Sequence, residues 1–139
     1  VDPTGTDRCD VRFARSVDGG NTWSPSIRVN ADPPGGNRWQ WFGTLGCAPN
    51  GRLDAVWNDT RTSNQANLCE LSYSFSVDGG SNWSTAVPVT PLWNSHLGWP
   101  NQDKIGDYYD IHSDIDAAHL AYAATFNGEQ DVYYVRIGN

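Results

Sequence analysis

One nine-residue phrase occurs twice in this chain, and it constrains the fold more than any other feature. Residues 16–24 read SVDGGNTWS and residues 76–84 read SVDGGSNWS, so seven of nine positions are identical at an offset of 60 residues. Self-similarity at such a spacing is typical of an architecture built from copies of one supersecondary unit. The Asp-Gly-Gly core predicts a hairpin turn, because glycine adopts positive φ without the steric clash of a Cβ atom.

Short runs of alternating apolar residues flank both copies and predict strands with one buried face. Residues 10–17 precede the first copy and residues 26–30 follow it, and both alternate with period two. Residues 71–75 and 87–89 flank the second copy in the same way. The fold class predicted from these runs is all-β.

Within each copy, the aspartate and the tryptophan have distinct expected roles. We expect Asp18 and Asp78 to accept hydrogen bonds from backbone N–H groups of their own turns. We expect Trp23 and Trp83 to fold over the hairpins as small local cores.

The phrase resembles the Asp-box, or BNR repeat, of sialidase-like β-propellers, which reads Ser-x-Asp-x-Gly-x-Thr-Trp. The first copy fits in full, and the second carries Asn82 where threonine is usual. The resemblance implies that the motif joins the third and fourth strands of a blade, on the outer part of the propeller and away from a substrate site. It therefore implies a structural role for Ser16, Asp18, Gly20, Thr22 and Trp23, and for Ser76, Asp78, Gly80 and Trp83.

Counting strands from the two copies gives the expected organisation. We expect the third and fourth strands of one blade in residues 1–35, a complete blade in 36–92, and the first three strands of a last blade in 93–139. The predicted strands lie near 9–17, 26–30, 40–47, 53–58, 69–76, 86–90, 105–112, 118–125 and 131–137. This is a partial β-propeller of about two to two-and-a-half four-stranded antiparallel blades, whereas closed propellers have roughly four to eight.

An arc of this size leaves blade faces uncovered, and stacked repeats need their neighbours. We therefore expect the partner to be the remainder of a parent propeller or, alternatively, further copies of this chain. Residues 46–61 and 104–110 resemble parts of secreted bacterial proteins described as exo-sialidase-like or BNR-repeat proteins. That resemblance implies an extracellular, secreted fragment from the C-terminal part of such a protein.

Two functions are compatible with this resemblance. One is a propeller piece that is non-catalytic by itself and has a glycan-binding or scaffold role. The alternative is the C-terminal part of an active exo-α-sialidase, a glycoside hydrolase that uses a tyrosine nucleophile with an acidic partner and grips a carboxylate with arginines. The residues that this alternative selects are Tyr108, Tyr109, Asp107 and Arg61.

Each of these candidates also has a structural interpretation. Arg61 can equally pair with Asp59 or Asp54 at the edge of a blade. The carboxylates of residues 103–116 can bond to backbone N–H groups in a solvated inner strand. The N-terminal Arg-Ile-Pro motif of sialidases is absent from the chain, which favours the non-catalytic interpretation.

Two further groups of side chains are candidates for ligands. Trp93 and Trp99 lie in the predicted loop 93–100, where they could stack on sugar rings or instead belong to the core. Asp114 and Asp116 offer hard oxygen ligands for calcium, although no glutamate-terminated calcium loop follows them. No other cofactor is expected.

Charge and cysteine content limit the remaining classes of partner. The formal charge of −7 argues against nucleic acid and against an anionic membrane surface. No run of 18 apolar residues is present, so no membrane span is expected. Cys9, Cys47 and Cys69 leave at least one thiol unpaired, and the sequence leaves the pairing open.

Overall fold

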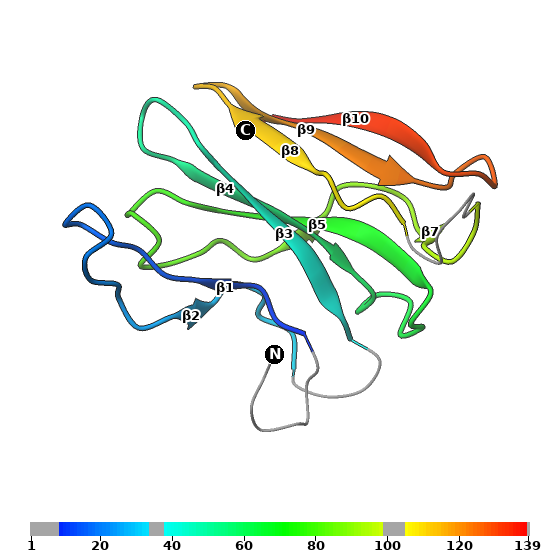
Figure 1. The fold of residues 1–139 in the computed structure, drawn as a ribbon, viewed down its shortest axis with the longest axis horizontal. Coiled ribbons are helices and arrows are strands. Elements are labelled where there is room, and N and C mark those ends of the chain that lie inside the picture. Colours follow the sequence, from blue (N-terminus) through cyan, green and yellow to red (C-terminus); the bar gives the residue numbers. More distant parts are fainter. Residues whose placement is uncertain (1–8, 34–37, 99–104, 139) are drawn as a thin grey trace.

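The computed structural model describes residues 9–33, 38–98 and 105–138, and these residues form strands and turns without a helix (Figure 1). The strands are β1 (Arg12–Phe13), β2 (Ile27–Arg28), β3 (Gln40–Cys47), β4 (Leu53–Asp59), β5 (Leu68–Ser76), β6 (Val87–Pro88), β7 (Trp93–Asn94), β8 (Asp110–Ser113), β9 (Ala117–Ala124) and β10 (Asp131–Gly138). Their pairings are antiparallel. The predicted all-β class is confirmed. In the part of the chain that is described, no helix is long and apolar enough to cross a membrane.

The strands form three sheets that follow one another across the molecule (Figure 1). The first sheet is β1–β2, and the third is β8–β9–β10. The second has the order β3–β4–β5–β6, and β7 pairs with the start of β5 through Leu68 and Cys69. Apart from β7, which pairs with β5, consecutive strands within each sheet are neighbours. Strands β3, β4 and β9 lie where the sequence predicts them.

Several predicted strand positions differ from the structure: the strands expected over 26–30 and 86–90 are regular only at Ile27–Arg28 and Val87–Pro88. The strand expected over 9–17 has regular pairing only at Arg12–Phe13, because Val11 N–H donates to the Asn30 side chain (2.8 Å) rather than to a strand. The strand expected over 105–112 begins only at Asp110. Residues 93–94, expected in a loop, form β7, and the Trp93 side chain is buried at 3% exposure among core residues.

Two apolar cores separate the sheets. The larger core includes Leu71 and Tyr73 of β5 together with Leu120 and Tyr122 of β9, so it lies between the second and third sheets. The smaller core groups Val29, Ala55 and Trp57 with partly buried side chains that include Val11, Phe13 and Trp83, and it joins the first sheet to the second. Alternation along β4 supplies both cores, because Val56 faces one and Ala55 and Trp57 face the other.

A buried ion pair links the second sheet to the third. Arg52 Nε lies 2.9 Å from Asp54 Oδ1, and the guanidinium also donates to the carbonyl oxygens of Asp114 and Ile115, each at 2.9 Å. Tyr73 donates its hydroxyl to Asp54 Oδ1 at 2.7 Å. The hydrogen bond to Asp54 raises the pKa of Arg52. Both side chains are hydrogen-bonded, as the burial of charged groups requires.

The two copies of the repeated phrase form turns with the same internal hydrogen bonds. We call residues 16–24 the first turn and residues 76–84 the second turn. Asp18 Oδ1 accepts Thr22 N–H at 2.9 Å, and Asp78 Oδ1 accepts Asn82 N–H at 2.9 Å. Ser16 Oγ accepts Gly20 N–H (2.8 Å), and Ser76 Oγ accepts Gly80 N–H (2.9 Å). These bonds confirm the expectation that each aspartate accepts backbone N–H groups of its own turn.

The one departure from the motif is compensated chemically. Thr22 Oγ1 donates to Asp18 Oδ2 at 2.6 Å, and Asn82 Nδ2 donates to Asp78 Oδ2 at 2.7 Å. The amide thus supplies the hydrogen bond that the hydroxyl supplies in the first turn. These donors lower the pKa of Asp18 and of Asp78 to about 2, with the Thr22 side chain the largest contribution in the first turn and the Asn82 backbone N–H in the second.

The tryptophans of the two turns have different environments, contrary to the expectation that both fold over their own hairpins. Trp23 is 65% exposed. Trp83 contacts Phe13 of the first sheet edge-on, with ring centroids 5.4 Å apart at an interplanar angle of 67°. The ring that packs on Trp83 therefore belongs to a neighbouring sheet.

We predict that Arg52→Leu lowers the free energy of unfolding by about 3–5 kcal/mol, because it leaves the fully buried Asp54 carboxylate without its counter-ion. Urea denaturation followed by tryptophan fluorescence measures the change. The control is Arg12→Leu, whose side chain is 47% exposed and whose effect we expect to be within about 0.5 kcal/mol. Equal losses for the two variants would contradict this role of Arg52.

We also predict a pH-dependent stability difference between the wild type and Asp78→Asn. Because the pKa of Asp78 is lowered from 3.8 to about 2 in the folded chain, its stabilising contribution is present above pH 4 and is lost as the pH falls toward 2. The wild type should therefore be more stable than Asp78→Asn at pH 6, and the gap should close near pH 2. Unfolding midpoints across this pH range test the prediction, and a gap independent of pH would contradict it.

Candidate functional site

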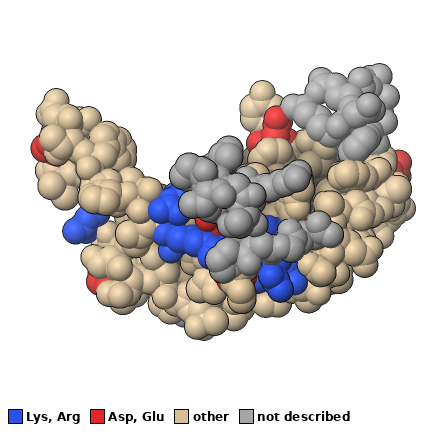
Figure 2. Space-filling model, turned by 90° about the horizontal axis from the view of Figure 1, so that it is seen from below, with Lys and Arg blue, Asp and Glu red and all other residues tan. Residues whose placement is uncertain are grey.

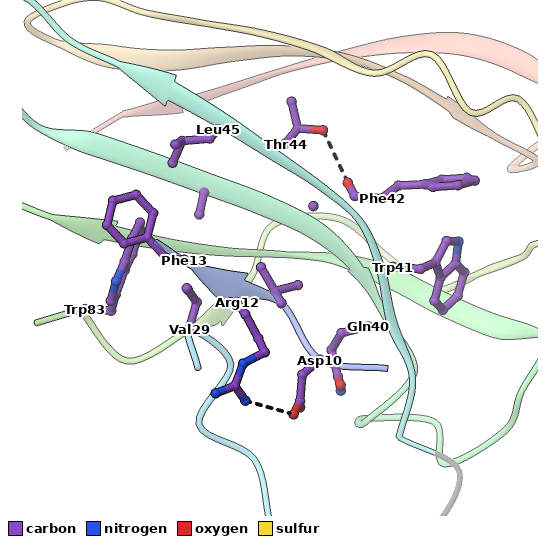
Figure 3. A pocket seen from close by; sticks show the side chains of 13 residues that line it. Asp10, Arg12, Phe13, Val29, Gln40, Trp41, Phe42, Thr44, Leu45 and Trp83 are labelled. Atoms are coloured by element: carbon purple, nitrogen blue, oxygen red, sulfur yellow. Dashed lines mark hydrogen bonds and ion pairs between the residues drawn. The ribbon is translucent and has the colours of Figure 1, made fainter. Parts of the chain in front are cut away.

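A cleft of about 300 Å³ lies between β1 and β3, where the first sheet meets the second (Figure 3). The apolar part of its lining includes Val11, Phe13, Val29, Ala55 and Trp83. The polar part is Asp10, Arg12, Gln40 and Thr44. An apolar wall with a few polar groups at one end is the usual composition of a small-molecule site.

A bulge in β3 creates the space for this cleft. The register of β3 against β4 shifts between Trp41 and Thr44, and Phe42 has a φ of 54°, a left-handed value that is rare outside glycine. The side chains of Trp41 and Phe42 consequently turn away from Phe13 and Trp83 (Figure 3). The Phe42 ring packs on Tyr109, with centroids 5.6 Å apart.

Gly43 occupies the position where the bulge comes closest to the first sheet. A Cβ atom at Gly43 would lie 3.3 Å from Val11 Cγ1. The cleft therefore opens beside the Gly43 backbone, the Val11 side chain and the rings of Phe13 and Trp83, while the rings of Trp41 and Phe42 also pack against the larger core. Bulges next to binding sites commonly re-aim side chains in this way.

Buried polar side chains form one end of the cleft. Asn30 Nδ2 donates to Asp10 Oδ1 (2.9 Å), to Asp32 Oδ1 (2.9 Å) and to Gln40 Oε1 (3.2 Å). Gln40 Nε2 in turn donates to Asp59 Oδ1 at 3.2 Å. These contacts run from the first sheet into the second and hold Asp10 and Gln40 in fixed orientations beside the cleft.

Arginines neutralise the carboxylates of this network. Arg28 Nε lies 2.5 Å from Asp10 Oδ1, and Arg12 Nη1 lies 3.9 Å from Asp10 Oδ2 at the open edge of the cleft. Arg61 Nε lies 3.2 Å from Asp59 Oδ2. Figure 2 shows the same local balance on one face of the molecule, where basic side chains gather near the middle with acidic atoms beside them. Arg12 also donates from Nε to Ser26 Oγ at 3.1 Å.

The structure does not bring the predicted catalytic residues together. Tyr108 is 95% exposed, whereas Tyr109 packs into the larger core and hydrogen-bonds through its hydroxyl to Asn58 Nδ2 (3.1 Å) and the Ala123 carbonyl (3.1 Å). Burial raises the pKa of Tyr109, which disfavours a phenolate nucleophile. Asp107 is exposed. None of these residues lines the cleft.

Arg61 has the structural role that the sequence left open as its alternative. Besides its ion pair with Asp59, its Nη2 donates to Ser72 Oγ (3.1 Å) and to the Ala86 carbonyl (3.2 Å). Its backbone N–H donates to Asp59 Oδ1 at 2.9 Å. The guanidinium is thereby fixed within the second sheet.

The ligand and calcium candidates are also dispersed. The burial of Trp93 makes its ring inaccessible to a sugar, and Trp99 lies outside the described residues. Asp114 Oδ1 accepts the N–H groups of Asp116 and Ala117, each at 2.7 Å, while Oδ2 contacts His119 Nε2 at 2.9 Å. The His119 contact contributes most to lowering the pKa of Asp114 to about 2.

Across residues 9–33, 38–98 and 105–138, no group of three or more His, Cys, Asp or Glu side chains is arranged to hold a metal ion. The three cysteines are free thiols.

Sequence reasoning missed the cleft and its polar end. Asn30, Asp32, Gln40 and Asp59 are nearly or fully buried, although each lies within or beside a predicted strand. Polar residues at positions that a strand should bury were the available signal, because burial requires each of them to find a partner. A chain of contacts from Asp114 through His119 to Tyr134, whose hydroxyl lies 2.6 Å from His119 Nδ1, was missed as well.

Comparison with known proteins adds no identification. No family model matches the chain, and no curated protein sequence matches it.

We predict that Tyr109→Phe lowers the free energy of unfolding by about 1–3 kcal/mol, because the buried Asn58 amide and Ala123 carbonyl lose a hydrogen-bond partner. The matched control is Tyr108→Phe, which removes the same hydroxyl from an exposed ring and should change stability by less than about 0.5 kcal/mol. Chemical denaturation of both variants compares them directly. A larger loss for Tyr108→Phe would contradict this assignment.

Proposed function

We propose that this chain is an arc of a sialidase-like, Asp-box β-propeller and that it binds a glycan in the cleft between β1 and β3 without catalysing a reaction. The propeller assignment is supported by three antiparallel meanders in sequence order. It is supported further by the two turns, whose Ser, Asp and Gly residues make matching hydrogen bonds. In this proposal the chain is a fragment of a secreted protein, and its partner is the remainder of the parent propeller or further copies of this chain.

The observation that carries the binding proposal is the composition of the cleft. Sugars present hydroxyl groups at their rims and C–H groups on their faces, so they need hydrogen-bonding side chains beside an apolar surface. Arg12 provides a planar polar group, and Phe13 and Val11 provide apolar surface, while the amide of Gln40 is buried and held by Asn30 and Asp59. Arg12 lies at the open edge with an exposed side chain, where it can donate to a ligand oxygen.

The geometry favours binding over hydrolysis. Asp10 Oδ1 accepts hydrogen bonds from Arg28 and from Asn30, so its carboxylate is oriented toward neighbouring donors rather than toward a ligand. Glycoside hydrolysis by the usual route needs a second carboxyl group across the scissile bond, and Asp10 is the only acidic residue in the described lining of the cleft. The tyrosines of the alternative mechanism lie elsewhere.

Titration of the chain with a panel of mono- and oligosaccharides, followed by NMR chemical shifts or calorimetry, tests this function. We expect at least one saccharide to bind, with Arg12→Leu weakening its affinity about tenfold, the value of a lost charged hydrogen bond. Arg136→Leu is the matched control, because this exposed arginine lies on β10 away from the cleft.

Several results would contradict the proposal. One is saccharide binding that Arg12→Leu leaves unchanged, or the absence of binding across the panel. Another is turnover of a fluorogenic sialoside by the chain, which would restore the glycosidase alternative. Arg12→Leu stability, measured in parallel, separates lost binding from lost folding.

A further inference from the structure

The contact between the first sheet and the second turn is a specific docking arrangement inside this chain. The Phe13 ring lies over Gly80, so close that a Cβ atom at that glycine would clash with it, and its edge meets the Trp83 ring. Arg15 Nη1 donates to the Gly79 carbonyl at 2.9 Å. The two glycines, with φ of 69° and 83°, thus form a flat surface on which an aromatic ring of a neighbouring sheet rests.

The first turn presents the same surface without an occupant. Its glycines have matching φ values of 72° for Gly19 and 90° for Gly20. No described residue lies within 4 Å of the position of a Cβ atom on either glycine. Trp23, the counterpart of Trp83, is 65% exposed. Because the hydrogen bonds within the two turns match, the surface is already formed and needs no rearrangement to receive an aromatic ring.

The complementary surface lies elsewhere on the same chain. The 60-residue offset maps Phe13, Arg15 and Val17 onto Tyr73, Phe75 and Val77. At that position there is a hollow of about 560 Å³, lined by these three residues together with Asn50, Arg52 and Gly138. Phe75 is 37% exposed and Val77 is 76% exposed, which are high values for apolar side chains beside a hollow.

We propose that the first turn of one copy docks into the hollow of a second copy, with Gly20 against the exposed ring of Phe75 and Trp23 in the hollow. In this contact Phe75 takes the role that Phe13 has over the second turn inside one chain, because Tyr73, which the offset places at the position of Phe13, is buried. Trp23 on the turn and Phe75 and Val77 in the hollow are exposed apolar side chains, so burying them against each other removes apolar area from water. A second copy is the occupant because it carries the complementary turn.

The contact is heterologous, since the turn and the hollow are different surfaces of the chain. Each copy therefore retains one free turn or one free hollow after docking, and association continues head to tail into a ring or an open chain of copies. The area of one turn is small for an interface, so association should depend strongly on concentration.

The experiment uses two variants that each remove one half of the contact. Trp23→Ser removes the tryptophan ring from the first turn and leaves the hollow intact. Val77→Asp places a charge in the hollow and leaves the first turn intact. Both side chains are largely exposed, so both variants should fold, and circular dichroism verifies this. Sedimentation equilibrium over a concentration series measures association, with Tyr108→Ser as a control that alters an equally exposed aromatic residue.

We expect the wild type and Tyr108→Ser to associate, and each half-contact variant to associate at least about tenfold more weakly. An equimolar mixture of the two variants should form dimers and nothing larger, because it contains only one intact turn and one intact hollow per pair. A monomeric wild type at all concentrations, or a mixture that does not dimerise, would overturn the proposal. So would association that survives in both variants but is lost in Tyr134→Asp, which would place the interface on the outer face of the third sheet.

This result is independent of the glycan proposal, since the hollow and the cleft between β1 and β3 lie on different faces of the second sheet. Failure of self-association leaves the saccharide titration unaffected. Failure of saccharide binding likewise leaves the sedimentation result intact.

Discussion

Two fully buried carboxylates on the central strand β4 connect the three sheets. Asp54 near its start pairs with Arg52, whose guanidinium reaches the backbone of the third sheet. Asp59 at its end accepts from Gln40, which the Asn30 side chain joins to the first sheet. The apolar side chains between these two positions fill the cores on either side. Apolar packing supplies most of the stabilisation, but it is non-directional, whereas the carboxylates require one relative placement of the sheets.

The cleft depends on a bulge in β3, where Phe42 adopts a strained backbone conformation that the surrounding packing stabilises. A left-handed Phe42 costs of order 1–3 kcal/mol and persists only where surrounding structure over-determines it. The compensation is visible on both sides of the strand, since Phe42 packs on Tyr109 and Gly43 approaches Val11. The bulge thus diverts two large rings into the core between the second and third sheets and leaves an open, partly polar space on the other side.

The sequence predicts those features that depend on near neighbours in the chain. The two turns are of this kind, because Asp78 and the groups it accepts lie within four residues of each other. Strands such as β5 are also predictable from alternation. The environments of Trp93 and Tyr109 are not, because each is fixed by a distant partner, Cys69 for the backbone of Trp93 and Asn58 for the hydroxyl of Tyr109. The cleft belongs to the same class, since it exists only where residues 10–13 meet residues 40–45.

The repeat itself demonstrates the limit of local similarity. The two turns share seven of nine residues and their main hydrogen bonds, yet one tryptophan is exposed and the other is covered. The difference arises from the neighbouring sheet, because only the second turn has a Phe13 placed over its glycines. The repeated phrase therefore determines the shape of a docking surface, while the arrangement of the sheets determines whether that surface is used within the chain or remains available to another molecule.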